Sequence, residues 1–451
     1  MPRAAMSPAS GQASRLGACS RGKGFIIEAP WGARRRDTPG RRGATPPVGS
    51  RTMGQIVAAM ASCHAPALFL RQPGEDPAQL EATIAAMRQL GRILDATQPD
   101  ALIILGLDHL EAFSLSVSPT FTVVVAPYVE GSFGPKQYRV PAHQELGRAL
   151  LEGLLRREFD VAFSQRAFMG HAFVVPFEYI LEERPIPVVP LFVNVYVPPL
   201  PQPRRCYRLG RALAEIIGTR PERVALLASG GMSHYPGTEK YPYPEFAFDR
   251  WVLEVLERGE ASRLLTLTLD KLDAMGNTEL LTWYVLFGAI GDRPAEVLTY
   301  QPTWHHGLGV VNFPLPQPQE GPPPERPLPD ATDTAPAYQY YRFPAPEAYN
   351  LNALLYTLRM NAAERARFVR DMDAMIAEYG LSAAEAAALK SLDPLAVAKA
   401  GAHPIMAWTA VHLVQADLRA GRIAPPPRNA SNSSRCAAAG TGEGGAEPPP
   451  A

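Results

Sequence analysis

The sequence has few cysteines, no excess of either charge and no long apolar run, and each absence excludes a class of protein. Four cysteines among 451 residues, none in a C-x-x-C pair, provide neither a disulfide framework nor a common zinc motif, so a reducing cytoplasm is the expected location. Basic and acidic residues balance at 44 each, which argues against nucleic acid or an anionic membrane as a partner. No apolar run approaches the roughly 18 residues that span a bilayer.

Proline, by contrast, is abundant, with 47 residues that cluster in two stretches. Residues 314–346 are proline-dense and aperiodic, which predicts a semi-rigid linker, and residues 421–451 read as a disordered Gly/Ala/Pro tail. Residues 1–52 are rich in Arg, Gly and Ser but lack the amphipathic pattern of a mitochondrial targeting peptide. We expect them to be a disordered extension, with Met53 as a natural first residue of the folded part.

Residues 53–313 alternate strand-like and helix-like patterns. The candidate strands are Gln55–Met60, Ala101–Gly106, Phe121–Ala126, Pro187–Val195 and Val224–Ser229. Helical patterns lie between them, at Ala78–Thr97 and Ala142–Arg157. This alternation predicts an α/β fold, in which helices sandwich a mostly parallel central sheet.

Residues 347–420 predict a small all-α C-terminal domain. Its helix starts are marked by two pairs with capping-box spacing and by one cap followed by proline: Asn361 with Glu364, Ser382 with Glu385, and Asp393 with Pro394. The chain is long enough to hold this domain beside the larger one.

Three histidines directly follow three of the predicted strands: His64, His109 and His234. In an open α/β sheet, ligands bind beyond the carboxyl ends of the strands, so these side chains are expected to converge on one site. One such histidine is more often structural, whereas three with the same placement favour a functional site. His171, which precedes the apolar run AFVVP, is a further candidate for lining the same pocket.

Glu279 is the carboxylate candidate for this site, because it stands at the head of the apolar run LLTWYVLFGAI. We expect Asn277 to cap the helix, which places Glu279 in the first turn. A buried carboxylate there is costly unless it is paired or bound to a metal, although the helix dipole alone would also favour it. Two histidines and one carboxylate form the facial triad of non-haem Fe(II) oxygenases, which would leave the third strand-end histidine for acid–base work. The pair His305-His306 is expected to be loop structure.

The histidines and Glu279 lie in five motifs that follow one another along the chain. They are SCHAP around His64, GLDHLEAF around His109, GHAFVVP around His171, SGGMSHYPG around His234 and GNTELLTW around Glu279. In this order, between Gln55 and Phe313, the motifs resemble those of the LigB-type, or class III, extradiol dioxygenases. The helical segment from Tyr349 to Arg419 is similar to the LigA-type unit, which is a separate chain in protocatechuate 4,5-dioxygenase and is fused in gallate dioxygenase-like proteins.

The resemblance implies a site and a reaction. His64, His109 and Glu279 would bind Fe(II), His234 would be the acid–base residue, and His171 would be a second catalytic or pocket residue. The substrates would be O2 and an aromatic diol similar to protocatechuate or gallate, whose ring is cut beside the diol with both oxygen atoms incorporated. The resemblance also implies a homodimer or a larger homo-oligomer.

Two questions stay open at this point. No motif assigns Lys136, Arg139 or Lys240 to a substrate carboxylate, although each lies in a plausible loop. A LigB-like fold also occurs in Memo-like proteins, so the alternative function is a non-catalytic protein that binds a metal or a partner. The complete set of site residues and the LigA-like segment favour the enzyme, with the helical domain as a lid that excludes water.

Overall fold

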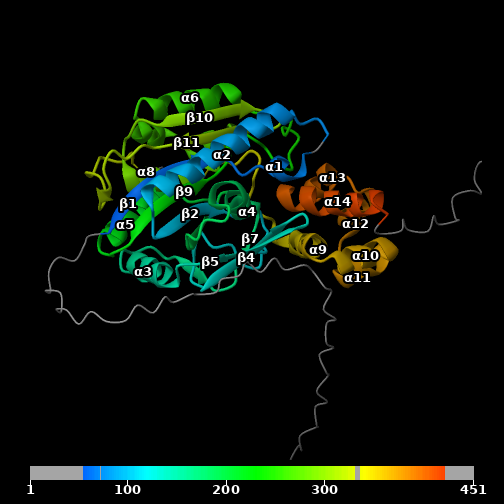
Figure 1. Ribbon diagram of the computed structural model, residues 1–451. Coiled ribbons are helices and arrows are strands. Elements are labelled where there is room, and N and C mark those ends of the chain that lie inside the picture. Colours follow the sequence, from blue (N-terminus) through cyan, green and yellow to red (C-terminus); the bar gives the residue numbers. More distant parts are fainter. Residues whose placement is uncertain (1–53, 72, 331–335, 422–451) are drawn as a thin grey trace, which may run out of the picture. The chain divides into compact units, whose positions relative to one another are not determined.

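A nine-stranded sheet forms the centre of the α/β region, which spans residues 54–313 (Figure 1). The computed structural model describes residues 54–71, 73–330 and 336–421, so the expected N-terminal extension and nearly all of the expected tail lie outside the described residues. In spatial order the strands are β10 (Glu296–Pro302), β11 (Gly307–Asn312), β1 (Gln55–Ser62), β9 (Arg223–Ser229), β2 (Ala101–Leu107), β8 (Val188–Val193), β3 (Phe121–Val124) and β6 (Ala162–Ser164), and β12 (Gln319–Glu320) pairs with β1.

The α/β prediction is confirmed, and all five predicted strands are present as β1, β2, β3, β8 and β9. The four central strands, β1, β9, β2 and β8, run parallel to their neighbours. The sheet is antiparallel on both sides of this group, where β11 pairs with β1 and β3 pairs with β8. All seven residues of β2 are buried, as expected for a parallel strand that is covered on both faces.

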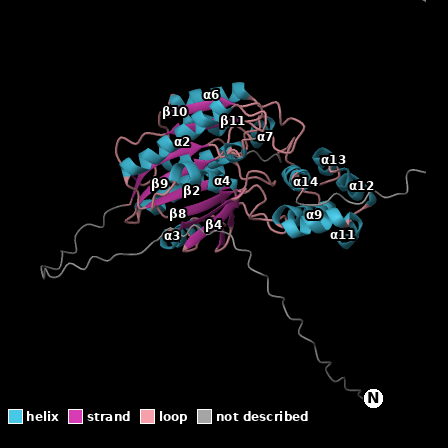
Figure 2. Cartoon of the chain, turned by 45° about the vertical axis from the view of Figure 1, so that its right-hand side comes forward, coloured by secondary structure: helices cyan, strands magenta, loops and turns pink. Residues whose placement is uncertain are grey.

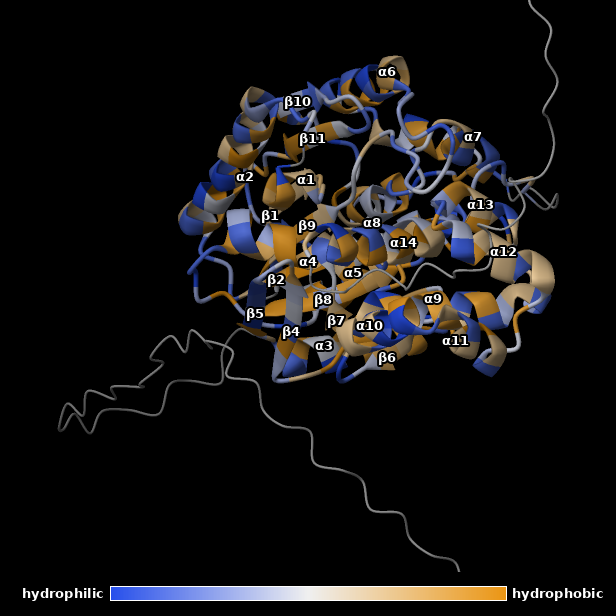
Figure 3. Ribbon diagram, turned by 90° about the vertical axis from the view of Figure 1, so that its right-hand side faces the viewer, coloured by the Kyte–Doolittle hydropathy of each residue, from blue (hydrophilic) through white to orange (hydrophobic). Residues whose placement is uncertain are grey.

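Helices cover both faces of the sheet (Figure 2). The chain steps from β1 to β2 through α2 (Pro77–Thr97) and returns from β8 to β9 through α5 (Pro203–Gly218). Because these steps cross the sheet in opposite directions, right-handed connections place α2 and α5 on opposite faces. Figure 3 shows hydrophilic and hydrophobic residues alternating along α2, as expected for a helix with one side on the sheet. By contrast α8 (Leu280–Ile290), which packs on α5 and the sheet, is buried at every residue.

The α/β region also contains a second, smaller sheet and further helices. A three-stranded sheet, which the sequence did not predict, is formed by β5 (Lys136–Pro141), β4 (Tyr128–Phe133) and β7 (Phe168–Met169). The helices are α1 (Ala67–Leu70), α3 (Gln144–Leu155), α4 (His171–Pro176), which continues into the π-helix η1 (Phe177–Leu181), α6 (Phe246–Glu257), the 3-10 helix η2 (Ala261–Thr266) and α7 (Leu269–Ala274). The predicted helices at 78–97 and 142–157 correspond to α2 and α3.

The C-terminal helices form a group, called here the helical region (Figure 1, orange and red). After the short 3-10 helix η3 (Pro346–Ala348) they are α9 (Tyr349–Met360), α10 (Ala362–Arg370), α11 (Met372–Glu378), α12 (Ala383–Ser391), α13 (Pro394–Lys399) and α14 (Pro404–Arg419). The three predicted helix starts are confirmed: Asn361 caps α10, Ser382 and Glu385 form a capping box at α12, and Asp393 caps α13 before Pro394.

The described part of the proline-dense segment 314–346 packs against the α/β region. The hydroxyl of Tyr338 accepts the backbone N–H of Leu200, and the buried Tyr341 donates its hydroxyl to the carbonyl oxygen of Pro236. Within the described residues, no helix is long and apolar enough to cross a membrane.

Candidate metal centre

Strand register brings the ends of β1, β9 and β2 level with one another. Ser62 of β1 pairs with Ser229 of β9, and Leu105 of β2 pairs with Ala228 of β9. The three strands are parallel, so the residues that follow them emerge at the same edge of the sheet. His64, His109 and His234 all lie just beyond this edge, in the place that α/β proteins use for ligands.

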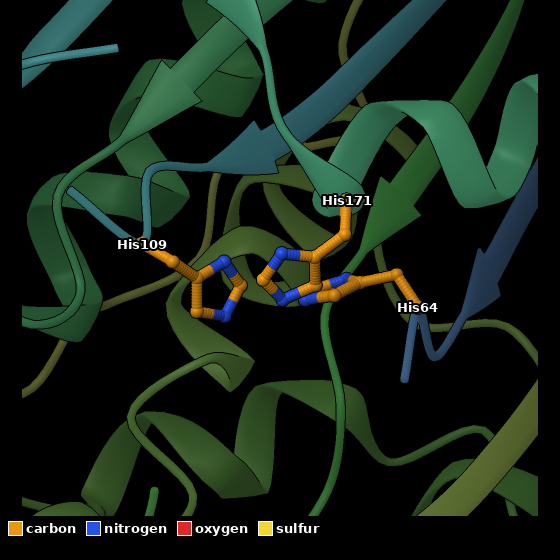
Figure 4. Close-up of side chains that lie close together, drawn as sticks. All are labelled: His64, His109 and His171. Atoms are coloured by element: carbon orange, nitrogen blue, oxygen red, sulfur yellow. The ribbon is translucent and has the colours of Figure 1, made fainter. Parts of the chain in front are cut away.

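His64, His109 and His171 form a buried group, called here the histidine cluster (Figure 4). The ring centroids of His64 lie 5.3 Å from His109 and 5.5 Å from His171, and those of His109 and His171 lie 3.9 Å apart. One ring nitrogen from each lies within 4.8 Å of the others, which is close enough to share a metal ion. Burial, together with the neighbouring His171, lowers the pKa of His109 to about 3, so this ring is neutral, as a metal ligand must be.

The hydrogen bonds of His64 leave one ring nitrogen free. Ser229 donates its only hydroxyl hydrogen to the carbonyl oxygen of Ala172, at 2.6 Å. The contact of 3.0 Å between Nδ1 of His64 and the hydroxyl oxygen of Ser229 therefore requires Nδ1 to donate. Nε2 is left with its lone pair, is buried and has no hydrogen-bond partner in the described structure. An unpaired buried acceptor of this kind fits a metal ligand.

His171 is oriented by a buried carboxylate. Its Nδ1 donates to Oε1 of Glu111 at 3.1 Å, which leaves Nε2 as the atom available to a ligand. Burial raises the pKa of Glu111, but His171 and Arg359 outweigh this and hold the pKa well below its usual range. Gly170 permits the arrangement, because a Cβ there would overlap Oε2 of Glu111. A carboxylate behind an imidazole is a common way to fix the ring that faces a metal.

Glu279 lies against two members of the histidine cluster. Its Oε2 is 3.4 Å from Nε2 of His64, and its Oε1 is 3.3 Å from Nε2 of His109. The backbone N–H of Gly231 donates to Oε2. Burial raises the pKa of Glu279, but the neighbouring imidazoles, first those of His64 and His234, outweigh it and hold the pKa well below its usual range. The carboxylate is therefore ionised and sits where a cation bound by the histidines would meet it.

The prediction that Asn277 caps α8 is wrong. Glu279 itself occupies the N-cap position, and Nδ2 of Asn277 donates to Oδ1 of Asp249 at 3.0 Å. The first helical N–H groups need no side-chain cap, because Leu280 and Leu281 donate to the carbonyl oxygens of Asn277 and Thr278, each at 3.1 Å. The side chain of Asn277 is thereby free to satisfy the buried Asp249.

His234 presents Nε2 to the same carboxylate. Nδ1 donates to the carbonyl oxygen of Met232 at 2.8 Å, which fixes the ring, and Nε2 lies 3.2 Å from Oε1 of Glu279. Burial lowers the pKa of His234, but the charge of Glu279 outweighs it and leaves the pKa above its ordinary value. Nε2 is thus an atom that can take up and hold a proton beside the centre.

Tyr196 is a site residue that the sequence interpretation missed. Its hydroxyl donates to Oε1 of Glu279 at 2.6 Å and lies 3.1 Å from Nε2 of His234. Burial, and next the charge of Glu279, raise its pKa well above the ordinary value, so it remains a phenol. The signal was present, because Tyr196 follows the buried strand β8 just as the three histidines follow theirs.

The two neighbouring histidines His305 and His306 differ in their surroundings. Nε2 of His305 lies 2.8 Å from Oε1 of Glu75, away from the histidine cluster. His306 stacks on His234 with ring centroids 3.9 Å apart and a 6° angle between the rings. A Cβ at Gly231 would overlap His306 and crowd Glu279, so the glycine keeps both side chains in place. His306 therefore lies beside the site residue His234, whereas the sequence suggested only a structural role in a loop.

The three candidate cations for a substrate carboxylate are paired with acids of the protein. Lys136 pairs with Glu178, Arg139 with Glu130 at 3.6 Å, and Lys240 with Glu245. Because each cation already has an acidic partner in the protein, the structure singles out none of the three as the partner of a substrate carboxylate.

Replacing Asp249 is expected to destabilise the turn that carries His234. The carboxylate accepts the N–H and hydroxyl of Ser233 at 3.0 and 2.8 Å, the amide of Asn277 and the hydroxyl of Tyr300. Asp249→Ala leaves these buried donors unpaired, which should lower the free energy of unfolding by about 3 kcal/mol or more in urea titrations.

Asp292→Ala is the matched control for Asp249→Ala. Asp292 accepts the same two groups from Ser262, at 2.7 and 2.8 Å, but its side chain is 12% exposed and water can replace it. The control is expected to lose about 1 kcal/mol. Equal losses in the two variants would contradict the role given to Asp249.

Comparison with known proteins gives the family. An α/β sheet with a buried group of histidines and carboxylates at its strand ends defines a candidate metalloprotein. Residues 58–312 match the catalytic LigB subunit of aromatic ring-opening dioxygenase, and residues 351–415 match the LigA subunit of aromatic-ring-opening dioxygenase LigAB. Since the first match covers more than half of the chain, the protein belongs to the LigB family of ring-opening dioxygenases. The resemblance drawn from the five motifs is confirmed.

Named relatives are distant. A 2,3-dihydroxyphenylpropionate/2,3-dihydroxicinnamic acid 1,2-dioxygenase of Burkholderia vietnamiensis is 27% identical over 298 residues, which cover 52% of this chain and 92% of that protein. A gallate dioxygenase of Pseudomonas putida is 29% identical over 275 residues, which cover 56% of this chain and 79% of that protein. A solved structure of an uncharacterized protein from Escherichia coli K12 matches with a TM-score of 0.42 and 19% identity, over 57% of this chain and 100% of that one, and supports no argument.

Proposed function

We propose that this protein is an Fe(II)-dependent extradiol dioxygenase that opens the ring of a catechol with both atoms of O2. The observation that carries the proposal is the unpaired, buried Nε2 of His64, which faces an ionised carboxylate and a second neutral histidine. Membership of the LigB family supports the ring-opening chemistry.

The proposed iron ligands are His64, His109 and Glu279. Two imidazoles and one carboxylate make up the facial arrangement that non-haem Fe(II) oxygenases use, with positions left open for substrates. His171 belongs to the histidine cluster and is the competing third ligand. We place it instead on the wall of the substrate pocket, because Glu279 supplies the negative charge that a divalent cation favours.

Bound Fe(II) would supply open positions for the two diol oxygens and for O2, and the redox chemistry that cleaves the ring beside the diol. The side chains of the protein would accept the substrate proton and keep the metal ligands in position. His234 takes a phenolic proton at Nε2, while the bond from its Nδ1 to Met232 keeps the ring in place. Tyr196 stays protonated and holds Oε1 of Glu279. The burial of all these groups keeps bulk water from the reaction.

The proposed substrate is a catechol that carries a carboxylate. Its support is the naming of two relatives for gallate and for 2,3-dihydroxyphenylpropionate, which share a ring diol and an acidic group. A homo-oligomeric assembly and a cytoplasmic location stay predictions from the sequence.

Oxygen uptake with a small set of catechols tests the proposed function. The full chain is purified without air, loaded with Fe(II) and mixed with gallate, protocatechuate, 3-O-methylgallate, dihydroxyphenylpropionate or a dihydroxypyridine. We expect one O2 consumed per ring opened, with a new near-ultraviolet or visible product band, for at least one carboxylated catechol. The same protein loaded with Zn(II) is the control and should consume none. Iron-loaded protein that consumes no oxygen with any member would contradict the dioxygenase proposal and favour a binding role.

A further inference from the structure

One side chain of the helical region reaches the histidine cluster. Arg359, in the last turn of α9, donates from Nη1 to the carbonyl oxygens of His109 and of Leu110, the latter at 3.1 Å. Its Nη2 lies 3.2 Å from Oε1 of Glu111, the carboxylate that orients His171. The side chain of Arg359 is only 7% exposed, so these bonds form away from water. One guanidinium thus touches the backbone of one cluster histidine and the carboxylate partner of another.

The loop that Arg359 contacts connects β2 to β3 and is held from two sides. From within the loop, the carboxylate of Asp108 accepts the backbone N–H groups of the three residues after Leu110, at 2.9, 2.9 and 3.0 Å. From the helical region, Leu110 is buried among apolar side chains of α9 and α14, and its backbone has a positive φ of 62°. Tyr356 of α9 adds a contact of 3.5 Å to the carbonyl oxygen of Glu111. The position of His109 therefore depends on contacts from α9.

We propose that Arg359 is a positioning residue of the metal centre, which sets His109 through its carbonyl oxygen and His171 through Glu111. The planar guanidinium suits this task, because its rigid fork presents donors from two nitrogens to two carbonyl oxygens and a carboxylate, whereas a lysine ammonium is a compact point charge on a flexible stem. This inference rests on the proposed function only in requiring that the cluster binds a metal. It makes the helical region a part of the metal centre.

The contact between Arg359 and Glu111 matters because Glu111 is a buried carboxylate with few other partners. Glu111 is buried, its Oε2 has no hydrogen-bond partner in the described structure, and its Oε1 is shared by His171 and Arg359. Removing the guanidinium leaves His171 as the remaining side-chain partner of this buried carboxylate, so the side chain of Glu111 should turn away from its present position. This change loosens the bond that orients His171.

Arg365 offers a matched control in the same region. It is also nearly buried, at 11% side-chain exposure, and it pairs with Asp417 at 2.7 Å. Its remaining bonds go to the carbonyl oxygens of Leu358 and Arg359 within the helical region. Arg365→Met therefore removes a comparable ion pair and two bonds to the end of α9, but keeps every side chain that contacts the histidine cluster. It measures the effect of loosening this end of α9 alone.

Cobalt binding to the full chain tests the proposal without any need for turnover. Metal-free protein is titrated with Co(II), whose visible absorption reports ligand geometry, and the dissociation constant and spectrum are compared among variants. Arg359→Met is expected to weaken Co(II) binding about 10- to 100-fold and to change the spectrum, as loss of a group that orients metal ligands usually does. Arg359→Lys should lie between Arg359→Met and the parent, and Arg365→Met should stay close to the parent in affinity and spectrum, because the guanidinium of Arg359 is kept.

The outcomes separate this proposal from the function on which it rests. If the parent protein binds no Co(II), the metal centre itself is contradicted. If the parent binds Co(II) and Arg359→Met binds it with the same affinity and spectrum, the role of Arg359 is overturned while the metal centre stands. Circular dichroism identifies a variant that fails to fold. If Arg359→Met fails to fold, Arg359→Lys and Glu111→Gln test the proposal in its place. Co(II) affinity and spectra equal to those of the parent in both of these variants would overturn it.

Discussion

Replacing Glu279 or His64 with alanine is expected to remove bound iron and ring-opening activity together. Each change deletes one of the two groups that face each other at 3.4 Å in the buried centre, and alanine offers no atom that can bind a metal in their place. Iron measured after anaerobic loading should fall from about one atom per chain to a small fraction of that amount. Oxygen uptake with the best catechol should fall to the rate of the metal-free protein, because the redox chemistry is supplied by the metal.

Two further variants define what this result means. Glu75→Ala is the matched control, because Glu75 is also a buried glutamate paired with a histidine, His305, but lies outside the proposed ligand set. It should keep its iron. His171→Ala separates the two candidate ligand sets, since iron lost from His171→Ala but kept in Glu279→Ala would make His171 the third ligand. Full iron in both Glu279→Ala and His64→Ala would rule out the proposed centre.

His234→Ala is expected to keep iron and lose most turnover. The residue lies outside the proposed ligand set, and its Nε2 is the atom beside Glu279 and Tyr196 that can accept a substrate proton. Loss of a general base typically costs about 10²- to 10⁴-fold in rate. The measurement is kcat under saturating catechol and O2, with iron content determined on the same sample.

His234→Gln is the companion variant, because glutamine can hydrogen-bond in place of the ring but cannot hold a proton at neutral pH. It should be as slow as His234→Ala. A glutamine variant with nearly full activity would show that His234 acts by hydrogen bonding and is not the base. Loss of iron from either variant would instead place His234 among the ligands.

Local signals in the sequence were sufficient for the central strands and for the convergence of the strand-end residues. Strands such as β2 are continuous apolar runs of ordinary length, and parallel packing then brings the residues beyond their ends together. The same logic applied to β8 would have found Tyr196. The helix starts at Asn361, Ser382 and Asp393 were predictable because capping depends on residues within one turn.

The rest of the centre depends on partners that are distant in the sequence. Arg359 and Glu111 are separated by about 250 residues, and nothing in the local pattern of either one indicates the other. The error at Asn277 has the same origin, since a buried carboxylate at Asp249 takes the amide that a local rule assigns to the helix. The small sheet of β4, β5 and β7 was missed because β4 and β5 are partly exposed and mix polar with apolar residues, and β7 is only two residues long.

The presence of Arg359 and His109 in one chain has a consequence for behaviour at low protein concentration. The link between them makes their meeting an intramolecular event, with an effective concentration that is on the order of millimolar for short linkers. Dilution therefore cannot separate the arginine from the loop that it holds. A protein that received the same arginine from a second chain would lose it once the total concentration fell below the dissociation constant of the pair. We therefore expect specific activity here to be independent of enzyme concentration down to the nanomolar range.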